Sequence, residues 1–375
     1  MRLPTDIEHK ILTLLGMSNL TWKTVAAYEN RLQRLRRQMY ALSDDYVQSR
    51  FSADTNADAY FAYNFPMNFM KAMIIGQKVR FFYPQLFNQK NILHILDIGC
   101  GEGAAMFGLY YSLKNSKQFM LTGLDQSSTK LKRCRKIASG LQQCSAHIRV
   151  ELRKQDASNG LLPKRSQKHD VIILANSLAE IFTTNTIPIT FIERISKSIH
   201  DDGIIIIVEP ALKHLARRLM HLRTEIVQKE KRFILLPCLH EKECSLIEIR
   251  KGKEWCHESI SWTPPDFMKI LNQGLNREID RLKFSHLVIS KQSLHKPRGF
   301  LVMSSLLREK GKKRCYLCTE DGLVELVRLN KHSTKSNKEF DSIKKGNIIA
   351  LEEYVNVKQH YWQVTKESKI HILFS

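Results

Sequence analysis

Three glycines at alternating positions, Gly99, Gly101 and Gly103, follow an apolar run at residues 92–98. Glycines of this kind let a chain turn sharply and let a ligand approach the backbone with no Cβ in the way. The segment beyond them reads as a helix, whose first turn offers free backbone N–H groups. The spacing differs from the G-x-G-x-x-G of pyrophosphate-binding loops. The sequence therefore predicts a different kind of cofactor loop at residues 99–103.

Three acidic residues accompany this loop. Asp97 precedes the glycines, and Asp125 ends a second apolar run 22 residues beyond Gly103. A carboxylate there can accept both hydroxyls of a ribose, and about 20 residues is the usual separation. Asp156 follows a third apolar run; it is either a ligand of an adenine amine or an ordinary loop aspartate.

The glycine loop with its preceding aspartate resembles motif I of S-adenosylmethionine (SAM)-dependent methyltransferases. The resemblance implies that the loop packs against the methionyl end of SAM. A nicotinamide site and a glycine turn without a ligand are the alternatives. The predicted SAM-binding residues are Asp97, Gly99, Gly101, Gly103, Asp125 and Asp156.

The residues that would accept or activate a methyl group are not recognisable. Amino-group methyltransferases usually carry Asn/Asp-Pro-Pro-aromatic after the fourth strand, where this chain has Ala175-Asn176-Ser177-Leu178. Cytosine-C5 enzymes need a cysteine nucleophile at a strand end. The cysteines of this region are instead expected in the cofactor loop, on a helix and in a loop. The catalytic residues therefore stay unknown.

Five of the eight cysteines fall between residues 238 and 318. Their spacing is not the CxxC…CxxC of a zinc ribbon. Four thiolates from an irregular region could hold a 4Fe–4S cluster or Zn²⁺, because both accept four-cysteine ligation. His240 and His257 stand beside two of the cysteines and could ligate zinc or donate to the ligands. Unrelated buried thiols are the remaining alternative. The five are Cys238, Cys244, Cys256, Cys315 and Cys318.

The elements that must position these residues read as α/β. Short apolar runs alternate with helical patterns over residues 91–210, as in a doubly wound parallel sheet. The strand candidates are residues 92–98, 119–124, 148–154, 170–174 and 203–208.

We predict a Rossmann-like SAM methyltransferase sheet with a helical N-terminal region and a cysteine-rich, metal-binding C-terminal extension. Further strand-like runs at 323–329, 347–351 and 370–374 are interrupted by a Lys/Ser/Asn-rich loop at 331–338. The predicted parts are a helical region (1–90), the Rossmann-like domain (91–232), an iron–sulfur region (233–322) and a small β-rich basic segment (323–375).

The chain is strongly basic, with 59 Lys and Arg against 37 Asp and Glu and a formal net charge of +22. A surplus of this size usually faces a polyanion, and nucleic acid is the obvious candidate. The alternative is a solvated basic surface without a partner. The purest apolar run, residues 204–208, is far too short to cross a bilayer, so no membrane partner is expected.

A more specific resemblance covers residues 50–350. The segments 58–62, 208–210, 237–244, 255–257, 283–287 and 317–322 resemble the mitochondrial-type small-ribosomal-subunit methyltransferase-like family and its bacterial relatives. This implies a 4Fe–4S cluster on Cys238, Cys244, Cys256 and Cys318, with Cys315 as the spare thiol. One departure is visible, because Leu239 stands where proline is common after the first cysteine.

The family resemblance implies action on the rRNA of the small ribosomal subunit, in ribosome assembly and translation, with no role on DNA. An rRNA methyltransferase is the first hypothesis, and a SAM-fold assembly factor without activity is the second. A metal-dependent redox enzyme is the weakest, since no acid/base pair stands out. The N-terminus shows no long apolar run and carries acids early, which favours a bacterial cytoplasm, with mitochondria as the alternative.

Overall fold

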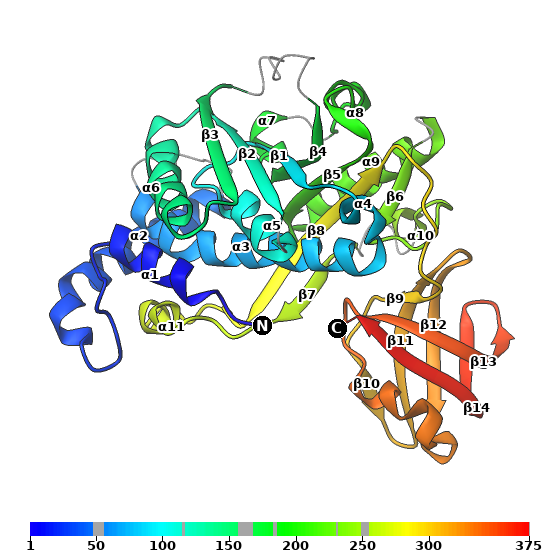
Figure 1. The fold of residues 1–375 in the computed structure, drawn as a ribbon. Coiled ribbons are helices and arrows are strands. Elements are labelled where there is room, and N and C mark those ends of the chain that lie inside the picture. Colours follow the sequence, from blue (N-terminus) through cyan, green and yellow to red (C-terminus); the bar gives the residue numbers. More distant parts are fainter. Residues whose placement is uncertain are drawn as a thin grey trace. The chain divides into compact units, whose positions relative to one another are not determined.

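The computed structural model describes residues 1–47, 56–114, 117–156, 168–182, 186–229, 232–248 and 255–374, with the backbone alone for residues 42–47, 245 and 248. Helices and strands alternate in the middle of the chain, and strands dominate its C-terminal part (Figure 1). The chain forms two compact units, one of residues 1–77, 90–161 and 261–282 and the other of residues 78–89, 162–260 and 283–375.

The first unit contains a parallel sheet of three strands in the order β3-β2-β1. Its helical N-terminal region contains α1 (Thr5–Leu14), η1 (Val25–Tyr28), α2 (Glu29–Val47) and most of α3 (Ala57–Phe82). The sheet elements are β1 (Ile92–Ile98), α5 (Ala104–Leu113), β2 (Gln118–Asp125), α6 (Ser128–Cys144) and β3 (Ile148–Lys154), and α11 (Asp266–Asn272) completes the unit.

Apolar patterning accounts for these elements. The last four residues of β1 are all buried, as expected of a central parallel strand. Ser127 begins α6, because its hydroxyl accepts the Lys130 backbone N–H at 3.3 Å. The face that α6 buries recurs at helical spacing and consists of Leu131, Cys134, Ile137, Ala138 and Leu141.

The second unit continues the α/β pattern with strands in the order β4-β5-β8-β6. Strands β4 and β5 are parallel, whereas β8 is antiparallel to both β5 and β6. Its strands are β4 (His169–Ala175), β5 (Ile199–Pro210), β6 (Phe233–Leu236), β7 (Glu258–Ser261) and β8 (Arg281–Ser290). Its helices are α4 (Gln85–Asn88), α7 (Leu178–Ile181), α8 (Ile189–Ser196), α9 (Lys213–Lys229) and α10 (Ser245–Glu248).

Together these strand orders confirm the predicted α/β class. Orders 3-2-1 and 4-5 are the two halves of a doubly wound, Rossmann-like fold, here extended by the antiparallel β8. All five strand candidates coincide with or lie inside β1 to β5. The four-part domain division stays a prediction, because the compact units combine segments from several of its parts. Among the described residues, no helix is both long and apolar enough to cross a membrane.

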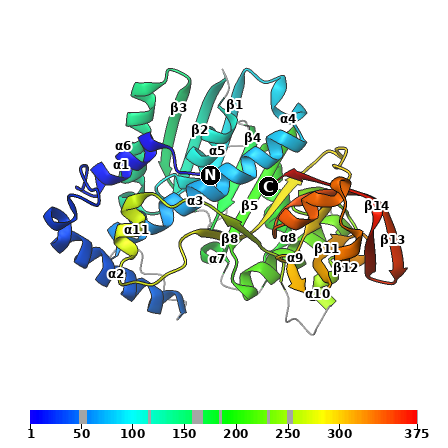
Figure 2. The ribbon, with the colours of Figure 1, turned by 90° about the horizontal axis from the view of Figure 1, so that it is seen from below.

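The end of the chain folds into a barrel of its own, seen from a second side in Figure 2. Its strands are β9 (Phe300–Val302), β10 (Leu307–Glu309), β11 (Lys312–Thr319), β12 (Gly322–Leu329), β13 (Ile348–Lys358) and β14 (Tyr361–Phe374). The order β11-β12-β14-β13-β9 closes on itself, because β9 pairs with both β13 and β11.

In this barrel β12 and β14 are parallel, and the other pairs are antiparallel. A helical connection joins β12 to β13. Five strands in this Greek-key order, with that connection, make an OB-type barrel. Its interior is apolar and includes Leu317, Leu326, Phe340, Trp362 and Val364.

The predicted loop at residues 331–338 is wrong, since two 3₁₀ helices, η3 (Asn330–His332) and η4 (Lys335–Ser342), lie there. Asn337 makes the turn possible. Its side-chain oxygen accepts the Thr334 backbone N–H at 3.1 Å, and its amide group donates to the His332 carbonyl at 3.0 Å. The buried Arg328 guanidinium also donates to the Asn337 carbonyl at 2.9 Å. A polar segment therefore folds because its polar groups bond one another, which composition alone does not reveal.

Candidate functional site

The glycine loop joins β1 to α5 in a tight left-handed turn. The φ angles of Gly99, Gly101 and Gly103 are 76°, 53° and 87°, a region that residues with a Cβ rarely adopt. The backbone N–H groups of Gly99 and Cys100 both donate to the Leu124 carbonyl, at 2.8 and 2.9 Å. The loop therefore lies beside the end of β2.

Gly103 and Gly101 have different structural roles in this loop. A Cβ on Gly103 would lie 2.5 Å from the Phe107 ring and 2.7 Å from the Cys134 sulfur, so this glycine permits helix packing. A Cβ on Gly101 would meet only the Lys130 side chain, at 3.7 Å. The backbone is therefore open at Gly101, where a ligand can approach it.

Asp125 is bonded to the glycine loop. One carboxylate oxygen accepts the Gly101 backbone N–H and the other accepts that of Ser127, each at 2.8 Å. The side chain is only 8% exposed. A carboxylate has about four acceptor positions, so two remain for further donors such as ribose hydroxyls.

Asp97 is fully buried under the same loop. Its Oδ2 accepts the Met106 backbone N–H at 3.1 Å, whereas its Oδ1 has no hydrogen-bond partner among the described residues. Burial raises the pKa of Asp97 to about 7; the Met106 bond lowers it, and the nearby Asp125 raises it further. A buried acceptor without a donor is costly and suits a ligand that brings a donor or a positive charge.

Asp156 lies two residues beyond the end of β3 and is half-buried. The preceding residue, Gln155, donates its backbone N–H to the Asp125 carbonyl at 3.0 Å. Asp97, Asp125 and Asp156 thus lie at the carboxyl ends of three neighbouring parallel strands, the edge where ligands bind in open α/β sheets.

A further cluster of charges beside the loop was not predicted. Glu102 is buried, and burial raises the pKa of its carboxyl although Lys130 and Arg133 oppose this. The Arg133 guanidinium lies 3.8 Å from Glu102 and is also bonded to Asp58 at the start of α3. Lys130 Nζ stands 5.6 Å from the centroid of the Tyr60 ring. The signal was present, because Asp58 and Tyr60 belong to the family-like segment 58–62.

The acceptor-side segment follows β4 in the second unit. Asn176 takes a left-handed φ of 56°, unusual for a residue with a side chain. Leu178 begins α7, and its backbone N–H donates to the buried Glu209 carboxylate at 3.1 Å. Glu209 of the family-like segment 208–210 therefore fixes this turn. Among the residues that the structure describes around this turn, no nucleophile is paired with a base, and the catalytic residues stay unidentified.

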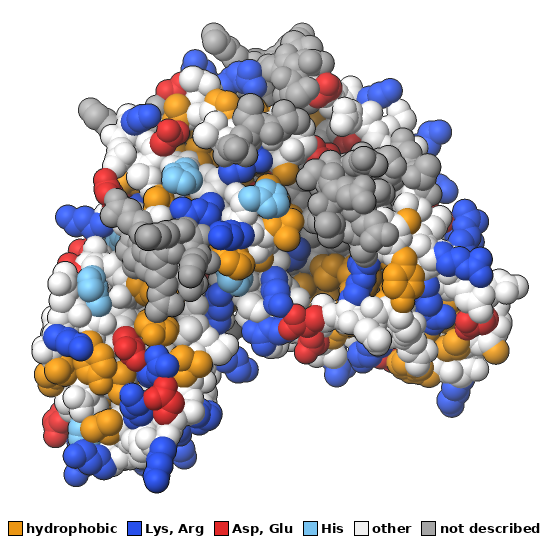
Figure 3. All heavy atoms as spheres, turned by 180° about the vertical axis from the view of Figure 1, so that it is seen from behind, with side chains coloured by type: hydrophobic (Ala, Val, Ile, Leu, Met, Phe, Trp, Pro, Cys, Tyr) orange, Lys and Arg blue, Asp and Glu red, His pale blue; other side chains and the backbone are white. Residues whose placement is uncertain are grey.

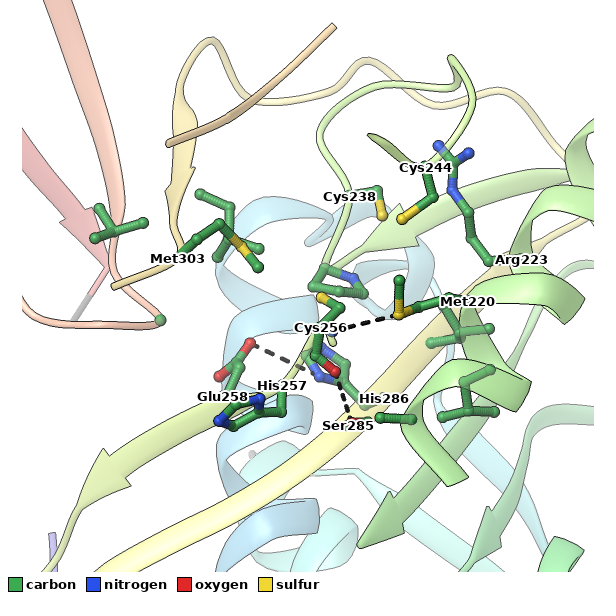
Figure 4. Close-up of a pocket in the computed structure, with 17 residues that line it drawn as sticks. Met220, Arg223, Cys238, Cys244, Cys256, His257, Glu258, Ser285, His286 and Met303 are labelled. Carbon is green, nitrogen blue, oxygen red and sulfur yellow. Dashed lines mark hydrogen bonds and ion pairs between the residues drawn. The ribbon is translucent and has the colours of Figure 1, made fainter. Parts of the chain in front are cut away.

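A second candidate site is a pocket in the second unit, lined mainly by apolar side chains. Cys238 and Cys244 come from the segment after β6, and Cys256 comes from just before β7 (Figure 4). In this view the sulfurs of Cys238 and Cys244 point toward each other. Cys256 is fixed by its backbone, since its carbonyl accepts the Ser285 hydroxyl at 2.8 Å.

Electrostatics show that Cys318 belongs to the same group. Burial raises the pKa of the Cys318 thiol well above its usual range, and the neighbouring Cys238 and Cys244 raise it further. Burial and the same two thiols, with Cys318, raise the pKa of Cys256. For Cys244, burial and then Cys238 raise the pKa to about 11. Burial and neighbouring thiols of this group therefore disfavour the thiolate form of Cys244, Cys256 and Cys318.

Cys315 is separate from this group. It is fully buried in the barrel interior, and burial alone raises its pKa to about 12. Side chains alternate along a strand, so Cys315 and Cys318, three positions apart on β11, point to opposite faces. The structure thus places Cys318, and not Cys315, with the other three thiols.

Two buried basic side chains support the pocket. The Arg223 guanidinium, 1% exposed, donates to the backbone carbonyls of His240 (2.8 Å) and Lys242, which holds the 238–244 segment. Its Nε is buried without a hydrogen-bond partner. His240 Nε2 lies 3.4 Å from the Cys318 sulfur. Burial and then Arg223 lower the pKa of His240 to about 4, so this ring is neutral.

The thiols are gathered but do not form a ready metal site. Within the described ranges, no three His, Cys, Asp or Glu side chains are arranged to hold a metal ion. The predicted metal-binding character of the cysteine-rich extension is therefore not shown by this arrangement.

Comparison with known proteins gives a family. The family model described as "Mitochondrial small ribosomal subunit Rsm22" matches residues 54–359. No curated protein matches the chain.

Two solved structures of SAM-dependent methyltransferases with bound S-adenosyl-L-homocysteine are similar to part of this chain. The protein from Thiobacillus denitrificans is 13% identical over 58% of this chain and 91% of its own, with a TM-score of 0.34. The one from Geobacter sulfurreducens is 14% identical over the same shares, also with a TM-score of 0.34. At such scores the fold assignment rests on the strand order above.

The buried Asp97 predicts a specific pH dependence of stability. Its pKa is about 7 in the folded chain and near 3.8 in the unfolded one, so the folded state holds a proton that the unfolded state releases. The stability from this proton is complete below about pH 4 and is lost as pH rises through about 7. Asp97→Asn cannot ionise, and its amide oxygen can still accept the Met106 N–H.

Urea unfolding should therefore show that the stability of Asp97→Asn increases relative to that of the original chain as pH rises from about 4 to about 7, by on the order of 2–4 kcal/mol. The matched control is Asp266→Asn, an exposed change at the start of α11. Parallel pH profiles for the original chain and Asp97→Asn would show that Asp97 does not hold the proton.

Proposed function

Because the chain belongs to the family described as Mitochondrial small ribosomal subunit Rsm22, we propose that it binds SAM and acts on the rRNA of the small ribosomal subunit. The observation that carries the SAM proposal is the loop itself, with an open backbone at Gly101 and a buried Asp97 oxygen that lacks a donor. The association with the small subunit follows from the family, and the basic surplus agrees with an RNA partner. Lys and Arg side chains are scattered over the face drawn in Figure 3, where acidic ones are fewer.

The residues at the loop fit SAM in chemistry as well as in place. Asp125 has two acceptor positions left for the ribose hydroxyls. Among the described residues, none donates to the buried Asp97 Oδ1, and such an acceptor would suit the cationic methionyl end. Asp156 would receive the adenine amine. Gly99, Gly101 and Gly103 keep side chains out of the way.

SAM would supply an activated methyl group, and the chain's own part is to position the acceptor in line with it. Positioning alone can remove a large share of a barrier. Asp97 and Asp125 orient the cofactor from beneath the loop. An acceptor base in rRNA would have to be unstacked first, because a paired base hides its reactive atoms.

Asp125→Asn tests the SAM site. The amide oxygen of Asn can accept only one of the two backbone N–H groups that Asp125 accepts, and its NH2 group faces the other, so thermal unfolding must show that the variant is folded. The variant also loses a charged acceptor for the ribose. We expect calorimetry to show SAM binding weakened about tenfold to hundredfold, the usual effect of losing hydrogen bonds to a charged group. Asp266→Asn should bind SAM like the original chain. Unchanged affinity in Asp125→Asn would remove this carboxylate from the site.

A second candidate function is an assembly factor that binds SAM and rRNA without transferring a methyl group. The segment 175–178 favours it, since Asn176-Ser177-Leu178 replaces the motif that grips an amino group and Glu209 serves as a helix cap there.

Methylation mapping separates the two functions. Small-subunit rRNA from cells lacking this chain should be compared with rRNA from cells carrying the original chain and Asp125→Asn. An enzyme predicts one modified nucleotide that disappears in both the deletion and the variant. An assembly factor predicts identical methylation with fewer mature small subunits. Either result excludes the other.

For the cysteine pocket we propose a 4Fe–4S cluster on Cys238, Cys244, Cys256 and Cys318, with Zn²⁺ as the alternative. The donors suit either, since both accept four thiolates. The buried Arg223, whose Nε lacks a partner, lowers the pKa of Cys244 and Cys318 and would offset the negative charge of four thiolates. His240 stands 3.4 Å from the Cys318 sulfur, where a ring N–H could donate to a thiolate.

Cys318→Ser and Cys315→Ser form a matched pair on one strand. We expect anaerobically purified protein to be brown and to contain iron and sulfide. Cys318→Ser should lose most of both, whereas Cys315→Ser should keep them although its barrel interior is perturbed. Colourless protein that contains zinc would show that the site holds Zn²⁺ instead of a cluster. Equal metal loss in both variants would show that the proposed ligand set is wrong.

The family description and the N-terminal sequence point to different compartments. The family description names mitochondria. The bacterial cytoplasm expected from the N-terminal sequence stays a prediction.

A further inference from the structure

The OB-type barrel at residues 300–374 has an outer face of which the proposed functions use only Cys318. On β11 the interior residues are Cys315, Leu317 and Thr319, so Arg314, Tyr316 and Cys318 point outward. Barrels of this type bind oligonucleotides on the face of their second and third strands, which here are β11 and β12. A fold does not by itself establish a binding function, so the inference depends on the side chains of this face.

Strand register aligns two aromatic rings on this face. Tyr316 on β11 pairs with Glu325 on β12, and Glu325 pairs with Tyr361 on β14. The three residues therefore form one row across three strands. Both tyrosines are partly exposed. The neighbouring Trp362 points the other way, into the barrel interior.

Basic side chains hold and flank these rings. The Arg314 guanidinium donates to the Tyr316 hydroxyl and to the Glu325 carboxylate, each at 3.0 Å, so the first ring is fixed in place. Lys358 Nζ lies 5.7 Å from the centroid of the Tyr361 ring. Residues 300–374 carry fourteen Lys and Arg against nine Asp and Glu. This surplus belongs to the barrel as a whole, since Arg314 beside the rings is paired with Glu309 and Glu325. Partly exposed aromatic rings on a basic domain are what single-stranded nucleic acid needs, for stacking and for its phosphates.

We propose that the outer face of β11, β12 and β14, called here the barrel face, binds single-stranded RNA with Tyr316 and Tyr361 stacked on bases. This inference rests on the proposed function, because it names the surface by which the chain would hold rRNA. Single strands are favoured over duplexes because only unpaired bases expose their flat faces to side chains. The pairing of Arg314 with Glu325 also argues for stacking rather than a phosphate clamp as the main contact.

The barrel face can be tested in the full-length chain with a fluorescently labelled oligouridine single strand, using duplex RNA of the same length as a competitor. The variants are Tyr316→Ala, Tyr361→Ala and the double change. Tyr316→Phe and Tyr361→Phe keep a ring that can stack. Tyr40→Ala, an exposed tyrosine on α2, is the matched control. Thermal unfolding and SAM affinity check that each variant is folded.

We expect each alanine variant to bind the single strand about 5-fold to 150-fold more weakly, since stacking contributes about 1–3 kcal/mol per base. Both phenylalanine variants and Tyr40→Ala should bind like the original chain, and the duplex should compete poorly.

Four results would overturn the inference. Alanine variants that bind RNA normally would show that the barrel face does not bind RNA, while leaving the proposed function in place. The same variants binding RNA normally but failing to join small subunits would make the face a protein-docking surface. Equal competition by duplex would remove the single-strand preference. An original chain that binds no RNA of either kind would remove the proposed RNA partner itself.

Discussion

A buried ion pair between Lys78 and Glu258 holds together the region on which the cysteine pocket depends. Lys78 Nζ lies 2.8 and 2.7 Å from the two carboxylate oxygens, with side-chain exposures of 2% and 5%. The same ammonium lies 3.4 Å from the Gly346 carbonyl, just before β13 of the barrel. Separating two such charges inside a protein is costly, because neither can find water. The end of α3, the start of β7 and the barrel are therefore fixed at one point.

Glu258 and Gly346 line the same pocket as the thiols. Glu258 is two residues from Cys256, and His286 Nδ1 lies 3.7 Å from the Glu258 carboxylate. Burial lowers the pKa of His286 to about 4, with Glu258 opposing it, so the ring is neutral and Lys78 is the cation that balances the carboxylate. The Lys78 ammonium thus links the segment that carries Cys256, through Glu258, to the Gly346 carbonyl.

The sequence predicted the parts of the molecule that local patterns determine. Residues 92–98 and 148–154 are strands with the predicted bounds, because apolar runs of that length between helical patterns have few other structures. Asp125 lies where the spacing placed it. Of the barrel, the sequence predicted only three short strand-like runs. Strand β9 was missed because it has only three residues and is defined by its pairing with strands distant in sequence. The charge cluster of Glu102, Arg133 and Asp58 was missed for the same reason, since its members meet only in three dimensions.

The alternation of side chains on β11 joins the two proposals about the C-terminal part. Cys318 and Tyr316 are two positions apart and share the outer face, whereas Cys315 is buried beneath it. The four thiols come from the segment after β6, from a position two residues before β7 and from the barrel, so a cluster would bridge the α/β part of the second unit and the barrel. Metal binding that joins separate segments contributes directly to their folded arrangement. A cluster on these cysteines would therefore stabilise the docked position of β11, with Tyr316 next to it, and RNA binding on the barrel face would depend on a metal that touches no RNA.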